Sequence, residues 1–163
     1  MSSEIIAGDL RVRRPKEREV LVQQLLAEND GIFISMAEAL LFAAALGWSR
    51  DRCEPFEKTE TQIRFDVFKK MPTGEAFIDA LAVMKSPGDP EILSDARAPE
   101  RIRIFEEYAN GGLAALQGEI NASRSPVADT LVDLVREACM EDRDKSSKVP
   151  ADIRKILSRP DWS

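Results

Sequence analysis

A short basic segment, RVRRPKER at positions 11–18, holds the residues whose types and spacing point most directly to chemistry. Its cations are Arg11, Arg13, Arg14, Lys16 and Arg18, opposed by one acid, Glu17. Such a segment could contact the phosphates of a DNA backbone, and five contacts would give binding a salt slope of roughly −4 to −5. The alternative is a solvated lead-in to a helix, although positive charge at a helix N-terminus opposes the helix dipole.

Histidine is absent from the chain, which narrows the enzyme classes to which it could belong. Its absence excludes Ser-His-Asp and Cys-His nucleophilic catalysis, histidine acid–base chemistry and the commonest zinc ligand. Two acidic groups, Glu106-Glu107 and Glu141-Asp142-Asp144, could hold magnesium in principle, but adjacent helical residues point about 100° apart. We interpret both groups as solvated faces and predict no catalytic residue, metal or cofactor. A carboxylate-dependent metal nuclease is the remaining enzymatic alternative.

Length and charge indicate one soluble domain with at most a local affinity for DNA. The 163 residues are 44% hydrophobic and 32% charged, which is typical of a globular chain with a core. The net charge is −6 and the sequence pI about 4.9. A protein that binds DNA unaided usually has a basic face and a high pI. Bulk charge therefore argues against a strong independent DNA binder, though not against a basic patch.

Neither a membrane span nor a secretory signal is expected. No apolar run reaches roughly 18 residues, and the first ten residues carry acids where a signal would carry basic residues. Cys53 and Cys139 stand apart from any CxxC pair, so free thiols are the preferred interpretation and one disulfide the alternative. We predict a cytoplasmic protein.

Apolar spacing predicts a mainly α fold, a compact bundle of about five to six helices with one short strand pair as a further option. A first helix is expected from Pro15 to about Ala27, ended by Asn29-Asp30-Gly31. The clearest helix follows a capping box of Ser35 and Glu38 and is expected to end at Gly47 as a left-handed cap. Its apolar residues cover nearly the whole circumference, which is typical of a central core helix or an interface.

The middle of the chain is harder to interpret. Ile63, Phe65 and Val67 alternate with polar residues, as in a half-buried strand, but Phe68 breaks the alternation and a helical turn is the alternative. Another helix is expected after Thr73-Gly74. Its apolar residues are Phe77, Leu81 and Met84, and a loop follows at 86–90.

A long helix is expected from Pro99 onwards. Its apolar stripe is Ile102, Phe105, Ala109, Leu113, Leu116 and Ile120. Two consecutive glycines, Gly111 and Gly112, interrupt it, and each costs roughly 1 kcal/mol relative to alanine within a helix. Close packing of another helix or a kink would offset that cost, and a ligand or partner backbone resting there is the alternative. Tyr108 and Asn110 supply polar groups one turn earlier.

A further helix is expected after Ser125-Pro126, with Ser125 as its cap. Its inward residues are predicted to be Val127, Leu131, Leu134, Val135 and Ala138. The charged segment 141–148 is interpreted as a linker, followed by a short C-terminal helix from Pro150. The expected organisation is a single helical domain over 1–140, with 1–10 as a flexible lead-in, and a separate segment over 141–163.

Three stretches together resemble a small bacterial family, the DNA phosphorothioation-associated protein 4 family. They are RRPKEREVLVQQLL at 13–26, MAEALLFAAALGW at 36–48 and DPEILSDARAPERIRIFEEYANGGLAALQ at 89–117. The resemblance covers about residues 10–120, and no counterpart is identified for the segment after Asn121. It implies a role in phage defence, beside the system that replaces a DNA backbone oxygen with sulfur. It implies no catalytic residue.

The leading hypothesis is a non-catalytic accessory subunit of such a modification or restriction system. It would bind other proteins of the system through an apolar helical surface and touch DNA through residues 11–18, and a homo-oligomer is compatible with this surface. The alternative is a DNA-binding transcriptional regulator of the same system.

Overall fold

The structure is a computed structural model that describes the backbone of residues 9–147 and the side chains of residues 9–141. It confirms a mainly α, compact single domain with one strand pair. Over the described residues the helices are α1 (Glu19–Gln24), α2 (Met36–Ser49), α3 (Phe65–Lys69), α4 (Gly74–Lys85), α5 (Ala98–Ala122) and α6 (Val127–Ser147). The strands are β1 (Arg11–Val12) and β2 (Ile63–Arg64), and short 3-10 turns are η2 (Lys16–Arg18), η3 (Ala27–Asn29), η4 (Pro90–Leu93) and η5 (Asp95–Arg97).

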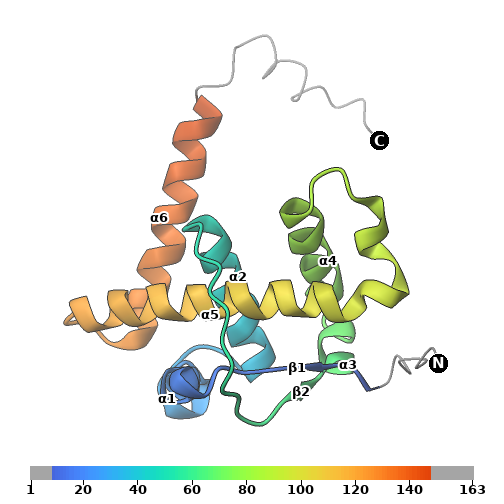
Figure 1. Cartoon of the computed structure of the whole chain (residues 1–163). Helices are drawn as coiled ribbons and strands as arrows, with labels where there is room; N and C mark the ends of the chain where they lie inside the picture. The colour runs from blue at the N-terminus through green and yellow to red at the C-terminus, as the bar shows by residue number, and fades with distance from the viewer. Residues whose placement is uncertain (1–8, 148–163) are drawn as a thin grey trace.

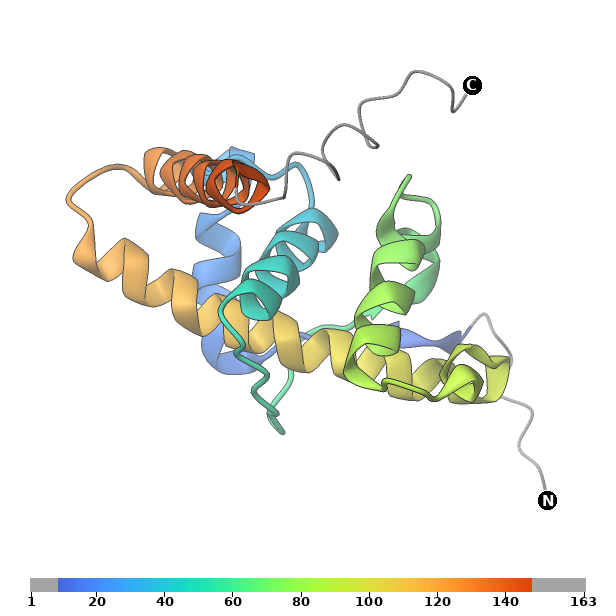
Figure 2. The ribbon, with the colours of Figure 1, turned by 90° about the horizontal axis from the view of Figure 1, so that it is seen from above.

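The long helix α5 runs through the whole domain and contacts most other elements (Figure 1). Viewed from above, α6, α2 and α4 follow one another along it (Figure 2). The paired strands β1 and β2 lie on the other side of α5 from α4 and α6 (Figure 1). The predicted stripe of α5 is buried except for Ile120, which is partly buried, and Phe105 packs edge-on against Phe68 of α3, with ring centroids 5.5 Å apart.

The crossing of α2 over α5 is the most extensive helix contact of the fold. A Cβ at Gly112 would collide with the carbonyl oxygen of Ala43, and one at Gly111 would collide with that of Arg52. Gly47 lies at the same crossing, against the carbonyl oxygen of Tyr108. The two central glycines of α5 therefore allow close approach of another backbone segment of the same chain.

The N-terminus of α2 confirms the predicted capping box. The Ser35 hydroxyl accepts from the Glu38 N–H at 3.2 Å, and the Glu38 carboxylate accepts from the Ile34 N–H at 2.9 Å. The predicted end of this helix at Gly47 is wrong. The helix continues to Ser49, and the left-handed residue after it is Asp51, at φ 52°. Gly47 serves packing on α5 and not helix termination.

The predicted start of the first helix at Pro15 is also wrong. Pro15 is extended, at φ −67° and ψ 125°, and forms an isolated bridge with Thr59. A 3-10 turn follows, and α1 begins only at Glu19. The stop signal at 29–31 is correct, since Asp30 takes a left-handed conformation there. Pairing with a distant segment has outweighed the local preference of proline for a first helical turn.

Both interpretations of residues 63–67 are partly right. Ile63 and Arg64 form the short strand β2, and the helical turn α3 begins directly after it. In α4, Leu81 is fully buried and Phe77 partly buried, but Met84, the third apolar residue of this spacing, is 46% exposed. The last turn of α4 therefore has one side open to solvent.

The last described helix, α6, stands away from α5 over most of its length (Figure 1). Leu131 and Leu134 are buried as predicted, whereas Val135 and Ala138 are exposed because no described element covers them. The interpretation of 141–148 as a linker is wrong, since α6 remains helical to Ser147. The lead-in over 1–8 and the expected helix from Pro150 lie outside the described residues.

Candidate functional site

The basic segment 11–18 runs antiparallel to residues 58–64, beside α5 (Figure 1). The β1–β2 pair holds one end, and the bridge between Pro15 and Thr59 holds the other. Successive side chains of an extended segment point to opposite sides. The five cations therefore cannot all face one ligand, and the structure divides them into internal and exposed groups.

Arg13 is held by a buried carboxylate on α5. Its backbone N–H donates to Glu106 Oε1 at 2.7 Å, and its guanidinium donates to Oε2 through Nε at 2.9 Å and Nη2 at 2.7 Å. The guanidinium also lies over the Phe56 ring, 5.1 Å from its centroid, a cation–π contact. The Glu106 side chain is only 2% exposed. The interpretation of Glu106 as part of a solvated face is therefore wrong.

Two opposing effects act on the pKa of Glu106. Burial raises this pKa, and the hydrogen bonds from Arg13 lower it by less. The same hydrogen bond raises the pKa of Arg13 above its ordinary value. Arg13 therefore stays charged and offsets the charge of the carboxylate when Glu106 is ionised.

Arg14 is an internal residue. It is 5% exposed, and its Nε donates to the Thr61 carbonyl at 2.7 Å while Nη1 donates to Glu19 Oε1 at 2.9 Å. These bonds connect the basic segment to the residues just before β2 and to α1. A buried side chain held in this way cannot reach a phosphate without leaving its partners, so Arg14 is not a candidate for DNA contact.

Arg11 is the clearest surface cation of the segment. It is exposed and forms no ion pair with any side chain that the structure describes. Arg64 is its directly opposed partner on β2, and Arg64 Nη2 lies 2.9 Å from Asp66 Oδ2. Like charges directly opposite each other destabilise an antiparallel pair. An anion bound between or beside these arginines would relieve that repulsion.

A pocket of about 270 Å³ lies between the start of β1 and the N-terminal half of α5. We call it the apolar pocket, because apolar atoms form most of its lining. Its residues are Leu10, Arg11, Arg13, Pro99, Ile102, Arg103 and Glu106. Arg103 is 58% exposed and has Glu107 Oε1 at 3.5 Å. The lining holds three cations and one carboxylate, so an anion is the favoured ligand.

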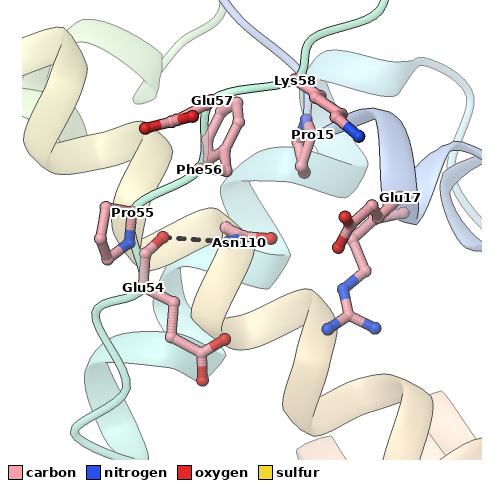
Figure 3. Close-up of a pocket in the computed structure, with 9 residues that line it drawn as sticks. Pro15, Glu17, Glu54, Pro55, Phe56, Glu57, Lys58 and Asn110 are labelled. Atoms are coloured by element: carbon pink, nitrogen blue, oxygen red, sulfur yellow. Dashed lines mark hydrogen bonds between the residues drawn. The ribbon is translucent and has the colours of Figure 1, made fainter.

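A second hollow of about 390 Å³, the polar pocket, lies beside Phe56 and Asn110 (Figure 3). Segment 54–58 forms one wall, and Pro15 with Glu17 and Arg18 faces it. Asn110 closes the pocket toward α5 and donates to the Glu54 carbonyl at 3.0 Å. Three acids line this pocket against Arg18 and Lys58, so it is a poor site for a phosphate.

Lys16 and Arg18 differ from Arg11 in their surroundings. Lys16 is exposed, with its Nζ 3.9 Å from Glu60 Oε1, and Arg18 is partly buried at the polar pocket. The described geometry does not bring either residue to the apolar pocket. The strongest group of surface cations is therefore Arg11 with Arg64 and Arg103.

The candidates in the middle of α5 contact residues of the same chain. Tyr108 is 2% exposed, packs edge-on against Trp48 with centroids 5.4 Å apart, and has Lys85 Nζ 5.6 Å from its ring centroid. Asn110 holds segment 54–58, and Gly111 and Gly112 accommodate backbone atoms. The space beside them is occupied by protein.

Sequence reasoning missed Glu106, Arg64 and Arg103 as parts of the site. A signal for Glu106 existed, because it lies four residues after Ile102 and three before Ala109, within the buried stripe. An acid at such a position predicts a buried cation partner. The contribution of Arg64 and Arg103 depends on strand register and on packing against β1, which no local pattern contains.

Among the residues that the structure describes, no group of three or more His, Cys, Asp or Glu is arranged to hold a metal ion. Cys53 and Cys139 are free, as predicted. No helix in the described part of the chain is long and apolar enough to cross a membrane.

The chain matches one protein family over most of its length, and no curated protein or solved structure matches it. The family is described as DNA sulphur modification system-associated protein 4, and the match covers residues 11–155. It includes the three stretches on which the resemblance rests and extends beyond residue 120, so α6 is also part of the family pattern. This chain belongs to the family of DNA sulphur modification system-associated protein 4.

Proposed function

We propose that the protein is a non-catalytic accessory component of its DNA sulphur modification system and contacts the DNA backbone beside β1 and β2. Family membership supports the association with such a system. The observation that carries the DNA contact is the placement of Arg11 directly opposite Arg64, with Arg103 at the same pocket as Arg11. Opposed arginines weaken the strand pair, so a ligand that neutralises them is the simplest reason for the arrangement.

Affinity for DNA should be low and strongly dependent on salt. The net charge of −6 opposes approach of a polyanion, and only cations within a Debye length of about 8–10 Å act on a given phosphate. Arg13 and Arg14 are held by partners within the protein, so Arg11, Arg64 and Arg103 would supply about three phosphate contacts, which gives a salt slope near −3 in place of −4 to −5. Stable residence on DNA would then depend on a protein partner.

The exposed apolar residues of α6 offer a surface for that partner. Val132 and Val135 are 47% and 48% exposed, and Met140 is 61% exposed. Recovery of other proteins of the system with the tagged chain tests this part of the proposal, and Val135→Glu should reduce it. A chain that stays monomeric and recovers none of them contradicts the accessory role.

The DNA contact is tested by fluorescence anisotropy with a labelled duplex at rising salt. Arg11→Gln combined with Arg64→Gln should reduce the salt slope by about 2. Arg124→Gln removes another exposed arginine, from the connection between α5 and α6, and is the control, expected to change little. Absence of binding at low salt would rule out the contact.

The same assay separates the accessory role from the regulator alternative. Backbone contacts carry no direct sequence information, so affinity should be similar for the promoter of the operon and an unrelated duplex. A preference of about 10³ or more for the promoter would favour the transcriptional regulator.

A further inference from the structure

We propose that the apolar pocket distinguishes a phosphorothioate from an ordinary phosphate and receives the sulfur atom of a sulfur-modified DNA backbone. This inference rests on the proposed contact between DNA and the surface beside β1 and β2, and it assigns a chemical selectivity to that contact. It follows from the combination of apolar walls and cations in one small hollow.

The apolar walls of the pocket come from the residue before β1 and from the N-terminal half of α5. Leu10 precedes β1 and is partly buried, and its carbonyl accepts from the Phe65 N–H at 2.9 Å. Ile102 is 4% exposed and packs in the core, while Pro99 lies in the first turn of α5. A proline and a residue whose backbone is paired hold their positions well. The apolar surface is therefore formed before any ligand arrives.

The cations lie at the same hollow. Arg11 and Arg103 approach it from β1 and α5, and both are exposed. Glu106 would repel an anion, but both of its carboxylate oxygens accept hydrogen bonds from Arg13. The pair is close to neutral and Arg103 lies 3.5 Å from Glu107 Oε1, so Arg11, which pairs with no described side chain, contributes most of the charge that a ligand meets. The polar pocket lacks this combination, since three acids line it.

Sulfur fits this pocket better than oxygen for a simple reason. A phosphorothioate keeps the single negative charge of a phosphate diester, so both are attracted by the arginines. Sulfur is larger, more polarisable and a weaker hydrogen-bond acceptor than a phosphate oxygen. An oxygen against Leu10 and Ile102 would lose its water without gaining a donor, which is costly, whereas sulfur loses less. The walls therefore select against phosphate.

The test compares two duplexes of one sequence, one with a single phosphorothioate and one fully oxygenated, with each sulfur stereoisomer examined separately. The wild-type protein should bind one stereoisomer roughly fivefold more tightly than the oxygen duplex, as expected when on the order of 40 Å² of weakly hydrated surface leaves water. Free thiophosphate serves as a competitor. Its failure to compete at millimolar concentration shows that the duplex and not the isolated anion is recognised.

Two substitutions separate the walls from the cations. Leu10→Asn should bring the ratio of the two affinities to about one while keeping affinity for the oxygen duplex. Pro99→Ser makes the same change at an exposed position where folding is least affected. Arg11→Gln should weaken both duplexes by similar factors. Leu93→Asn makes the same change at an exposed leucine on η4, away from this pocket, and is the control.

The outcomes distinguish this inference from the proposed function. Equal affinity of the wild-type protein for all duplexes would overturn the proposed selectivity for sulfur but would not contradict the proposed DNA contact. Selectivity that survives both Leu10→Asn and Pro99→Ser also overturns it, because the sulfur then binds elsewhere. Absence of binding to every duplex at low salt overturns the DNA contact itself.

Discussion

The two long helices, α5 and α6, have similar lengths but opposite relations to the rest of the protein. Of the 25 residues of α5, more than half are buried, including a carboxylate and an asparagine. The 21-residue α6 buries Thr130, Leu131 and Leu134 among its described side chains and exposes Val132, Val135 and Met140. The comparison indicates that α5 determines stability and the shape of the candidate site, whereas the exposed apolar residues of α6 form the surface that we propose for a partner.

Of the substitutions that test this difference between α5 and α6, Gly112→Ala should lower the stability of the protein most. The added Cβ would collide with the Ala43 carbonyl oxygen at the crossing of α2 and α5, and backbone atoms cannot move aside cheaply. We expect the free energy of unfolding to fall by more than about 4 kcal/mol, measured by urea unfolding with circular dichroism. Gly118→Ala is the control on the same helix, where a Cβ meets nothing within 4 Å. It should stabilise by about 0.5–1 kcal/mol.

Arg13→Met should cause the second-largest loss of stability, because it leaves the Glu106 carboxylate buried without its partner. Loss of one member of a fully buried pair costs about 3–5 kcal/mol, and we expect about 2–4 here since the Arg13 side chain is 35% exposed. Arg103→Met removes an exposed arginine from the same region and should change stability by less than about 0.5 kcal/mol. Similar losses for the two variants would contradict the assignment of Arg13 to the core.

The Arg13→Met deficit should depend on pH. Burial already raises the pKa of Glu106, and removing the hydrogen bonds of Arg13 raises this pKa further. The folded variant then holds a proton that the unfolded chain releases above about pH 4.3. Its stability therefore falls as pH rises through the window between the unfolded and folded values. The deficit relative to the wild type should be smaller near pH 5 than at pH 8, and a constant deficit would oppose this account.

Within α6, Leu131→Ala and Val135→Ala should separate the packed side from the exposed side. Leu131 is fully buried, so its truncation should cost about 2–4 kcal/mol through lost contacts and a cavity. Val135 is 48% exposed, and its truncation should cost less than about 0.5 kcal/mol. Equal costs in dilute solution would show that the outer side of α6 is already covered by a second copy of the chain.

The smallest effect concerns thiol reactivity and leaves the fold unchanged. Burial raises the pKa of the half-buried Cys53 thiol, whose Sγ lies 3.6 Å from Glu107 Oε2, whereas Cys139 is exposed on α6. At pH 8 we expect Cys139 to react with a disulfide reagent about tenfold faster than Cys53. Mass spectrometry of the wild type and of Cys139→Ser measures the two rates. Equal rates would indicate that segment 51–54 opens readily from α5.

Local signals predicted the elements well where the residues concerned interact with near neighbours in the sequence. The Ser35 hydroxyl accepts from the Glu38 N–H and the Glu38 carboxylate accepts from the Ile34 N–H, so the start of α2 follows from residues 34–38. The glycines of α5 predicted close packing because their cost within a helix requires compensation. The prediction that α2 ends at Gly47 failed because the role of this glycine depends on a distant residue. Gly47 resembles a helix end, but the contact it serves is with Tyr108, far along the chain.

The candidate site was predictable only in part. Composition identified the cations of the basic segment, yet which of them remain at the surface depends on Glu106, far along the chain on α5. The apolar pocket needs Leu10 and Ile102 to meet across two elements, and the opposition of Arg11 and Arg64 needs the strand register. These are consequences of tertiary packing, and local sequence patterns do not contain them.

The bond between Arg13 and Glu106 joins residues 93 positions apart, and this has a consequence for synthesis on the ribosome. The early part of the chain can form α2 locally, and β1 can pair with β2 once residue 64 is made, but Arg13 has no carboxylate partner until Glu106 on α5 has been translated. Contacts of such long sequence separation slow folding and leave apolar surface uncovered for longer. We therefore expect nascent chains that stop before residue 106 to bind chaperones, and those that extend past Leu116 to be released.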